Sequence, residues 1–167
     1  MPAKSHLALC FLLYLLANAG CDSVNGEPTF PHRVVGVGEH NDEMNCAVLR
    51  AQETFASFER NWRLPGIESY SLKFAMDTDV DRIEHVWFTP VRIDGDQITA
   101  RCANDPKNIA SLKYGDVRML NRESLSDWMI MTGGKCYGGY TIRALAKIDP
   151  TSVPSLQFAD YPEDDRK

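Results

Sequence analysis

Three short segments of the sequence place charged and aromatic side chains side by side. They are Glu84-His85-Val86-Trp87, Ser126-Asp127-Trp128 and Gly138-Gly139-Tyr140-Thr141-Ile142-Arg143. A histidine next to a carboxylate is the usual pair for acid/base catalysis, so one interpretation is a hydrolase that uses His85 with Asp127 or Glu84. Tryptophan, tyrosine and arginine together are typical of binding hot spots, so the second interpretation is a binding face. The candidate binding residues are Glu84, His85, Trp87, Asp127, Trp128, Tyr140 and Arg143. A third interpretation is structural, with Arg143 paired to Asp127 or Glu84 to brace a sheet.

Metal and cofactor sites are not expected. Neighbouring side chains on a strand point to opposite faces, so Glu84 and His85 would not share a ligand. The acidic run 77–81 begins like a calcium loop, but Arg82 and Phe88 stand where that loop needs glycine and glutamate. We therefore predict neither a metal nor a cofactor.

Nucleophilic catalysis has little support in the spacing. Cys136 follows Lys135, which would lower its pKa, but no base is fixed near it by sequence. A triad built on Ser124 or Ser126 lacks the Gly-x-Ser-x-Gly elbow. We predict no catalytic residue.

The first 21 residues have the layout of a secretory signal. Lys4 and His6 precede the apolar run 7–17, and small residues lead to Cys21. We expect residues 1–20 to be a lipoprotein signal peptide, Cys21 to be lipidated, and residues 21–33 to be a tether. Ordinary signal cleavage and an uncleaved anchor are the alternatives. The expected location is the periplasm-facing side of a bacterial membrane, and Asp22 favours the inner membrane.

The charge of the chain limits the kinds of partner it can bind, and its cysteines allow one disulfide. The 167-residue chain has 18 Lys and Arg against 23 Asp and Glu, a net charge of −5, which disfavours nucleic acid. Membrane contact is expected through the lipid anchor alone. In an oxidising compartment we expect a Cys102–Cys136 disulfide, because both positions lie on apolar strand faces whereas Cys46 lies on the polar side of a helix. The alternative is that all three thiols are reduced.

The apolar pattern predicts an α+β domain over residues 34–148. A helix begins near Asn41 or Asp42 and ends at Pro65-Gly66, because apolar residues recur every three or four positions. Its apolar stripe is Met44, Val48, Ala51, Phe55, Phe58 and Trp62. A short strand at 34–37 and further strands near 69–76, 83–89, 97–103, 117–120 and 126–131 follow from alternation and turn residues. We expect this N-terminal amphipathic helix to pack on a twisted antiparallel sheet or half-barrel of five to six strands.

The C-terminal part is less clearly patterned. Residues 140–148 fit either a helix or a strand, and in the strand interpretation Tyr137, Gly139, Thr141 and Arg143 share one face. Residues 149–167 contain three prolines and an acidic run, which predicts an irregular and partly disordered tail.

The order of several motifs resembles the YegJ-like family, domain of unknown function 2314. The motifs are Glu84-His-Val-Trp87, Asn104-Asp-Pro106, Tyr114-Gly-Asp116, Leu125-Ser-Asp-Trp-Met129 and Gly138-Gly-Tyr-Thr-Ile-Arg143. The resemblance spans about residues 34–146. It implies a bacterial protein without an assigned activity, so no functional residue is carried over.

Three functions therefore compete. The first is a non-enzymatic module that binds a protein, a peptide or a cell-wall component, with an immunity or inhibitor protein as its specific version. The second is an envelope hydrolase using His85 with Asp127 or Glu84. The third is a structural envelope lipoprotein.

Overall fold

The computed structural model describes residues 42–161. The expected signal peptide, Cys21, the tether and the strand at 34–37 lie outside this range. The elements are α1 (Asp42–Glu53), α2 (Phe55–Asn61), β1 (Ser69–Asp77), β2 (Ile83–Asp94), β3 (Gln97–Cys102), β4 (Val117–Asn121), the 3-10 helix η1 (Arg122–Ser124), β5 (Leu125–Thr132), β6 (Lys135–Gly138), α3 (Tyr140–Ile148) and β7 (Phe158–Ala159).

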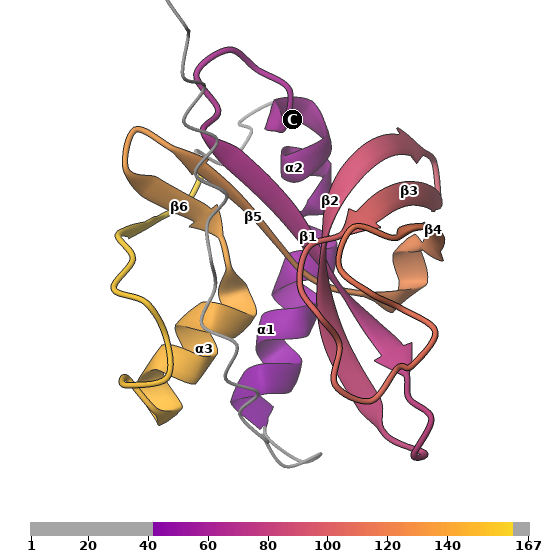
Figure 1. Cartoon of the computed structure of the whole chain (residues 1–167). Helices are drawn as coiled ribbons and strands as arrows, with labels where there is room; N and C mark the ends of the chain where they lie inside the picture. The colour runs from indigo at the N-terminus through magenta and orange to yellow at the C-terminus, as the bar shows by residue number, and fades with distance from the viewer. Residues whose placement is uncertain (1–41, 162–167) are drawn as a thin grey trace, which may run out of the picture.

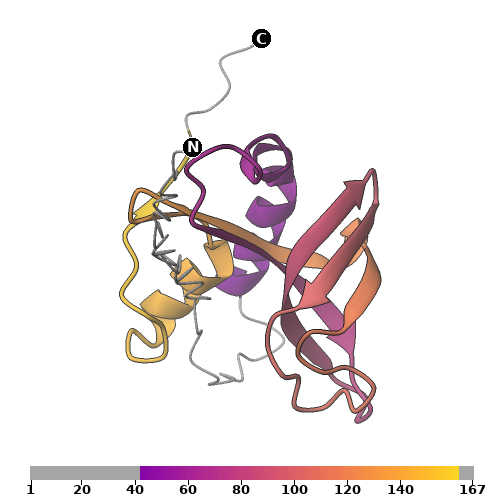
Figure 2. The same cartoon turned by 45° about the horizontal axis from the view of Figure 1, so that its top comes forward.

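The strands form one sheet in the order β4-β3-β2-β1-β5-β6-β7. Every pairing is antiparallel except β6 with β7. Figure 1 shows β1 and β5 crossing the middle of the molecule, with β6 and α3 on the left and β2, β3 and β4 on the right. Turned as in Figure 2, the molecule has the curled strands β2–β4 on one side and α3 on the other. The predicted α+β class is confirmed.

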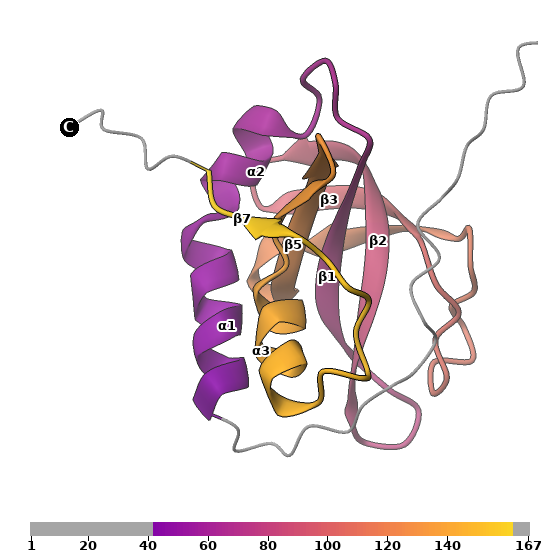
Figure 3. The same ribbon diagram turned by 90° about the vertical axis from the view of Figure 1, so that its left-hand side faces the viewer.

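The two faces of the sheet have separate hydrophobic clusters. Figure 3 shows α1 and α2 on one side of the sheet, where Phe55 and Phe58 pack against the strands. The alternation predicted for β1 is confirmed, because Leu72 and Phe74 are fully buried in this larger cluster. A smaller cluster on the opposite face is formed by Trp87, Met129, Cys136 and Ile142, with Val153, Leu156 and Phe158 packed against it.

The expected long helix is broken at Thr54, which is a correction. The indole Nε1 of Trp128 donates to the carbonyl oxygen of Ala51 at 3.0 Å, and Thr54 Oγ1 donates to that of Arg50 at 2.7 Å. A continuous helix would offer the Ala51 oxygen to the amide of Phe55. A side chain inserted into the hydrogen-bond ladder is a recognised cause of such a break.

Residues 140–148 form a helix, so the strand interpretation was wrong. Gly138 and Gly139 have φ of +74° and +63°, which end β6 and turn the chain into α3. As far as residue 161 the C-terminal segment packs on the domain: Ser152 is buried and β7 pairs with β6. Arg143 anchors it by donating to the carbonyl of Ala159 at 2.7 Å.

The expected Cys102–Cys136 disulfide is absent, and both thiols are free and buried. Cys102 belongs to the cluster on the helix side of the sheet, whereas Cys136 belongs to the cluster on the opposite face. Strands β2, β1 and β5 also lie between their strands. A disulfide needs Cα atoms within about 7 Å, and four strand spacings amount to about 19 Å.

Candidate functional site

A polar cluster lies on the face of the sheet opposite α1 and α2. Lys73 on β1 stands between Trp87 on β2 and Asp127 on β5, as the register of both strand pairs requires. The register between β1 and β5 shifts after Lys73, which leaves Ser126 as an extra residue on β5. Such a bulge re-aims side chains, and here it brings the hydroxyl of Ser126 to the same place. We refer to Lys73, His85, Trp87, Ser126, Asp127 and Thr141 as the Lys73 cluster.

Asp127 caps the start of α3 from across the chain. Its Oδ1 accepts from the amides of Trp128 at 2.8 Å and Tyr140 at 3.0 Å. Its Oδ2 accepts from the amide of Thr141 at 2.9 Å and from its hydroxyl at 2.5 Å. The side chain is fully buried. Burial raises its pKa, while Lys73 and these hydrogen bonds act in the opposite direction. Because amides can only donate, both oxygens serve as acceptors and satisfy the free amides of a helix start.

Lys73 is half-buried and points toward this cap. Its ammonium donates to Thr141 Oγ1 at 3.0 Å, so a hydrogen-bonded chain runs from Lys73 through Thr141 to Asp127. The ammonium also lies 5.1 Å from the centre of the Trp87 ring, within the range of a cation–π contact. Burial lowers the pKa of Lys73, and the charge of Asp127 partly offsets this effect.

His85 forms the outer edge of the cluster. Its Nδ1 lies 2.8 Å from Ser126 Oγ, and that hydroxyl donates to the carbonyl of Lys73 at 3.2 Å. The hydroxyl has one proton, so Nδ1–H of neutral His85 donates to Ser126 and Nε2 remains an acceptor. Although part of the ring is exposed, burial of the rest and the charge of Lys73 lower its pKa to about 4.

Glu84 lies apart from His85, as the strand alternation requires. It is buried, and it accepts hydrogen bonds from the amides of Lys107 at 2.8 Å and Asn108 at 2.9 Å. Its carboxylate therefore holds the loop between β3 and β4, and neither oxygen faces His85.

The remaining predicted residues have structural contacts. Trp128 is buried on the helix side, and Tyr140 meets its ring edge-on with 5.8 Å between centroids. Arg143 donates to the carbonyl of Gly138 and forms its ion pair with Asp160 at 2.8 Å, rather than with Asp127 or Glu84. Of the seven predicted residues, the structure brings three together: His85, Trp87 and Asp127.

Sequence reasoning missed Lys73 and Thr141. The only signal for Lys73 was its place on the polar side of an alternating strand, which most exposed lysines share. The position of Lys73 opposite Trp87 and Asp127 depends on the strand register. The position of Thr141 depends on where α3 begins.

No metal site or membrane span is found among residues 42–161. No group of three or more histidine, cysteine or carboxylate side chains in that range is arranged to hold a metal ion. The helices of the same range are too short or too polar to cross a membrane.

Comparison with known proteins defines the class of the molecule. Residues 41–149, which include the whole Lys73 cluster, match the family described as "Uncharacterized protein conserved in bacteria (DUF2314)". The chain therefore belongs to the DUF2314 family, and the predicted resemblance is confirmed.

Two relatives illustrate this membership. The chain is 32% identical over 108 residues to "Uncharacterized protein YegJ" of Escherichia coli (strain K12), covering 65% of this chain and 70% of the relative. It is 31% identical over 119 residues to "Putative ankyrin repeat protein NMB1133/NMB1171" of Neisseria meningitidis serogroup B (strain ATCC BAA-335 / MC58). That match covers 65% of this chain and 47% of the relative, so the chain spans about half of the second protein. No solved structure matches the chain.

Proposed function

We propose that this protein is a non-enzymatic binding module, and that it recognises a protein partner through the Lys73 cluster and the sheet face around it. The observation that carries the proposal is the way its acidic groups are used. Both carboxylates that a hydrolase would need, Asp127 and Glu84, already accept hydrogen bonds from backbone amides on both of their oxygens. His85 has Ser126 as its partner instead of an acid.

Two candidate nucleophiles, Ser126 beside His85 and Cys136 on β6, are also unsuited to catalysis. Ser126 is 1% exposed, so its hydroxyl does not meet a substrate without a rearrangement of β5. Burial raises the pKa of Cys136 to about 11, which keeps the thiol protonated at neutral pH. These observations favour recognition over turnover.

A protein surface fits this face better than a small molecule. Small-molecule sites are usually concave. One hollow of about 480 Å³ lies under the loop containing Pro106 and Leu112, and another of about 280 Å³ lies between α1 and α3. Neither is lined by Lys73, His85 or Trp87. The name of the Neisseria relative also points toward binding, since ankyrin repeats form binding surfaces. An immunity or inhibitor protein is the specific version of this proposal.

We also propose that the module is held in the bacterial envelope by a lipid on Cys21. The support is the basic start, the apolar run and the small residues before this cysteine. Cells grown with radiolabelled palmitate should label the wild-type chain and not Cys21→Ser. An unlabelled wild-type product in the soluble fraction would contradict the anchoring, though not the binding.

The binding proposal is tested by crosslinked affinity capture from envelope fractions. The variants Lys73→Met and His85→Gln alter the cluster, and Lys135→Met is a matched control because Lys135 is exposed on β6. We expect the wild type and the control to capture one discrete partner. The amount of that partner captured should be at least tenfold lower with each of the two cluster variants. Identical captures from all four chains, or no partner from any of them, would favour a purely structural lipoprotein.

A further inference from the structure

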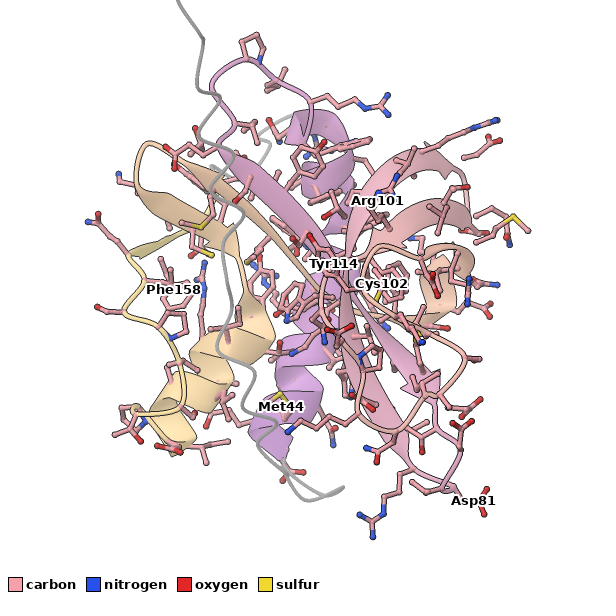
Figure 4. The ribbon with its side chains drawn as sticks, viewed as in Figure 1. Met44, Asp81, Arg101, Cys102, Tyr114 and Phe158 are labelled. Atoms are coloured by element: carbon pink, nitrogen blue, oxygen red, sulfur yellow. The ribbon has the colours of Figure 1, made fainter. Side chains whose placement is uncertain are left out.

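The sheet face beside the Lys73 cluster extends over β2, β3 and β4. Arg101 stands opposite Thr89 on β2 and opposite Val117 on β4, so these three side chains form one row across the sheet. Met119 lies two residues along β4 on the same side and is 72% exposed, while Val117 is 45% exposed. We call Lys73, Thr89, Arg101, Val117 and Met119 the open face. In Figure 4, Arg101 lies near the middle of the molecule, far from Asp81 at the turn between β1 and β2.

This face is locally basic in an acidic protein. The chain has a net charge of −5, yet the charged members of the open face are Lys73 and Arg101. Arg92 and Asp94 lie further along β2 on the same side and pair with each other at 2.6 Å, so together they add no net charge. The buried carboxylate of Asp127 is adjacent and offsets part of the charge of Lys73, while its oxygens are occupied by the start of α3. Asp77, on the same side of β1, is four residues from Lys73, or about 13 Å along a strand.

The loop carboxylates near this face are also engaged. Asp105 accepts from the amide of Tyr114 at 2.9 Å, and Asp116 accepts from the amide of Lys113 at 3.1 Å and pairs with Arg118 at 3.4 Å. These contacts tie both side chains to the loop between β3 and β4 and to Arg118.

The ammonium of Lys73 has donors to spare. An ammonium carries three N–H groups. Among the described residues, its hydrogen-bond partner is the hydroxyl of Thr141, and its ion pair with Asp127 is indirect, through that hydroxyl. Arg101 is exposed and uses one N–H group of its five on the carbonyl of Gly115 at 2.9 Å. Two cations with spare donors are therefore presented beside an exposed apolar edge.

We infer that the partner is an acidic protein segment, whose carboxylates meet Lys73 and Arg101 and whose apolar side chains cover Val117 and Met119. This inference rests on the proposed binding function and names the chemistry of the partner. An anionic lipid surface suits the face less well, because such recognition usually takes clusters of four to eight exposed cations, whereas this face has two and one is recessed. Carboxylates are favoured because lysine and arginine form charge-assisted hydrogen bonds with them.

Labelled nonapeptides test the inference with the purified full chain. One peptide alternates Val with Glu, the second alternates Val with Gln, and the third alternates Val with Lys. Fluorescence anisotropy at low salt should give an affinity for the Glu peptide at least tenfold higher than for the Gln peptide, with none for the Lys peptide. Lys73→Met and Arg101→Gln should each lower the affinity for the Glu peptide at least fivefold, whereas Lys135→Met should leave that affinity unchanged.

Equal affinities for the Glu and Gln peptides, or no binding of any peptide, would overturn the acidic partner. Phosphatidylglycerol vesicles that bind more tightly than the Glu peptide would also overturn it, in favour of a lipid. Arg101→Gln keeps the test decisive if Lys73→Met fails to fold, because Arg101 is exposed. A partner captured through the Lys73 cluster, together with equal peptide affinities, would refute this inference and leave the binding function in place.

Discussion

Asp127 connects the packing of α3 to the electrostatics of the Lys73 cluster. It accepts four hydrogen bonds, and it supplies the negative charge near Lys73. Asp127→Ala should lower the free energy of unfolding by about 3–5 kcal/mol, because it leaves the partly buried charge of Lys73 without its counter-charge and the amides at the start of α3 without their acceptor. Urea unfolding measures the loss. Adding Lys73→Met to Asp127→Ala should restore part of the lost free energy of unfolding, because the cation that lacks its counter-charge is then removed. If the losses of the two single variants simply add in the double variant, Lys73 and Asp127 are not energetically coupled.

His85 gives the fold a dependence on pH in the mildly acidic range. Its pKa is about 4 in the folded chain against an ordinary 6.5, so between these values the unfolded chain binds a proton that the folded chain does not. The contribution of His85 to the free energy of unfolding should therefore be fully present above pH 6.5 and should decrease as the pH falls from 6.5 toward 4.

Urea midpoints measured across that range should fall less steeply for His85→Gln than for the wild type. Carboxylates titrate in both chains, so the difference between the two curves isolates His85. Parallel curves would show that the ring titrates at its ordinary pKa.

At the scale of elements, the turn from β6 into α3 depends on close approach of the backbone to Trp128. A Cβ at Gly138 would lie 2.7 Å from Cζ3 of the Trp128 ring and closer still to its carbonyl oxygen, at a φ of +74°. Gly134 has a similar φ of +70° and nothing within 4 Å, so it is a matched control.

Gly134→Ala should lower the free energy of unfolding by about 1–2 kcal/mol, because alanine is strained in the left-handed backbone conformation at this position. Alanine at Gly138 should cost about 1–3 kcal/mol more, because the ring or the strand must shift. Equal losses in thermal or urea unfolding would mean that this contact is easily relaxed.

Sequence patterns predicted the positions of helices and strands better than the contacts between residues of different helices and strands. Alternation placed Leu72 and Phe74 in the core, because a half-buried strand requires it. Periodicity could not reveal the break at Thr54, since it depends on an indole 74 residues away. The three residues that do meet in the cluster, His85, Trp87 and Asp127, were chosen by residue type. Their meeting with Lys73 requires the register of three strands and a bulge, and neither is encoded in a local pattern.

At the scale of the whole molecule, the sheet has one face covered by helices and another covered mainly at its β5–β6 end. The smaller cluster of Met129, Cys136 and Ile142 fills that end, while Val117 and Met119 are exposed at the β4 end. This division leaves the Lys73 cluster at the border between packed and exposed surface. A partner that binds there would contact residues of β1 to β4 and leave α1 free.

Site-specific photocrosslinking in living cells tests the central claim most directly. A benzoylphenylalanine at Thr89, on the same side of β2 as Trp87, places the probe beside the Lys73 cluster without replacing any of its residues. The same residue at Leu49, which is 59% exposed on α1, places it on another surface. We predict one discrete crosslinked protein from position 89, weakened by Lys73→Met, and none from position 49. The same products from both positions, or none from position 89, would contradict a binding surface on this face of the sheet.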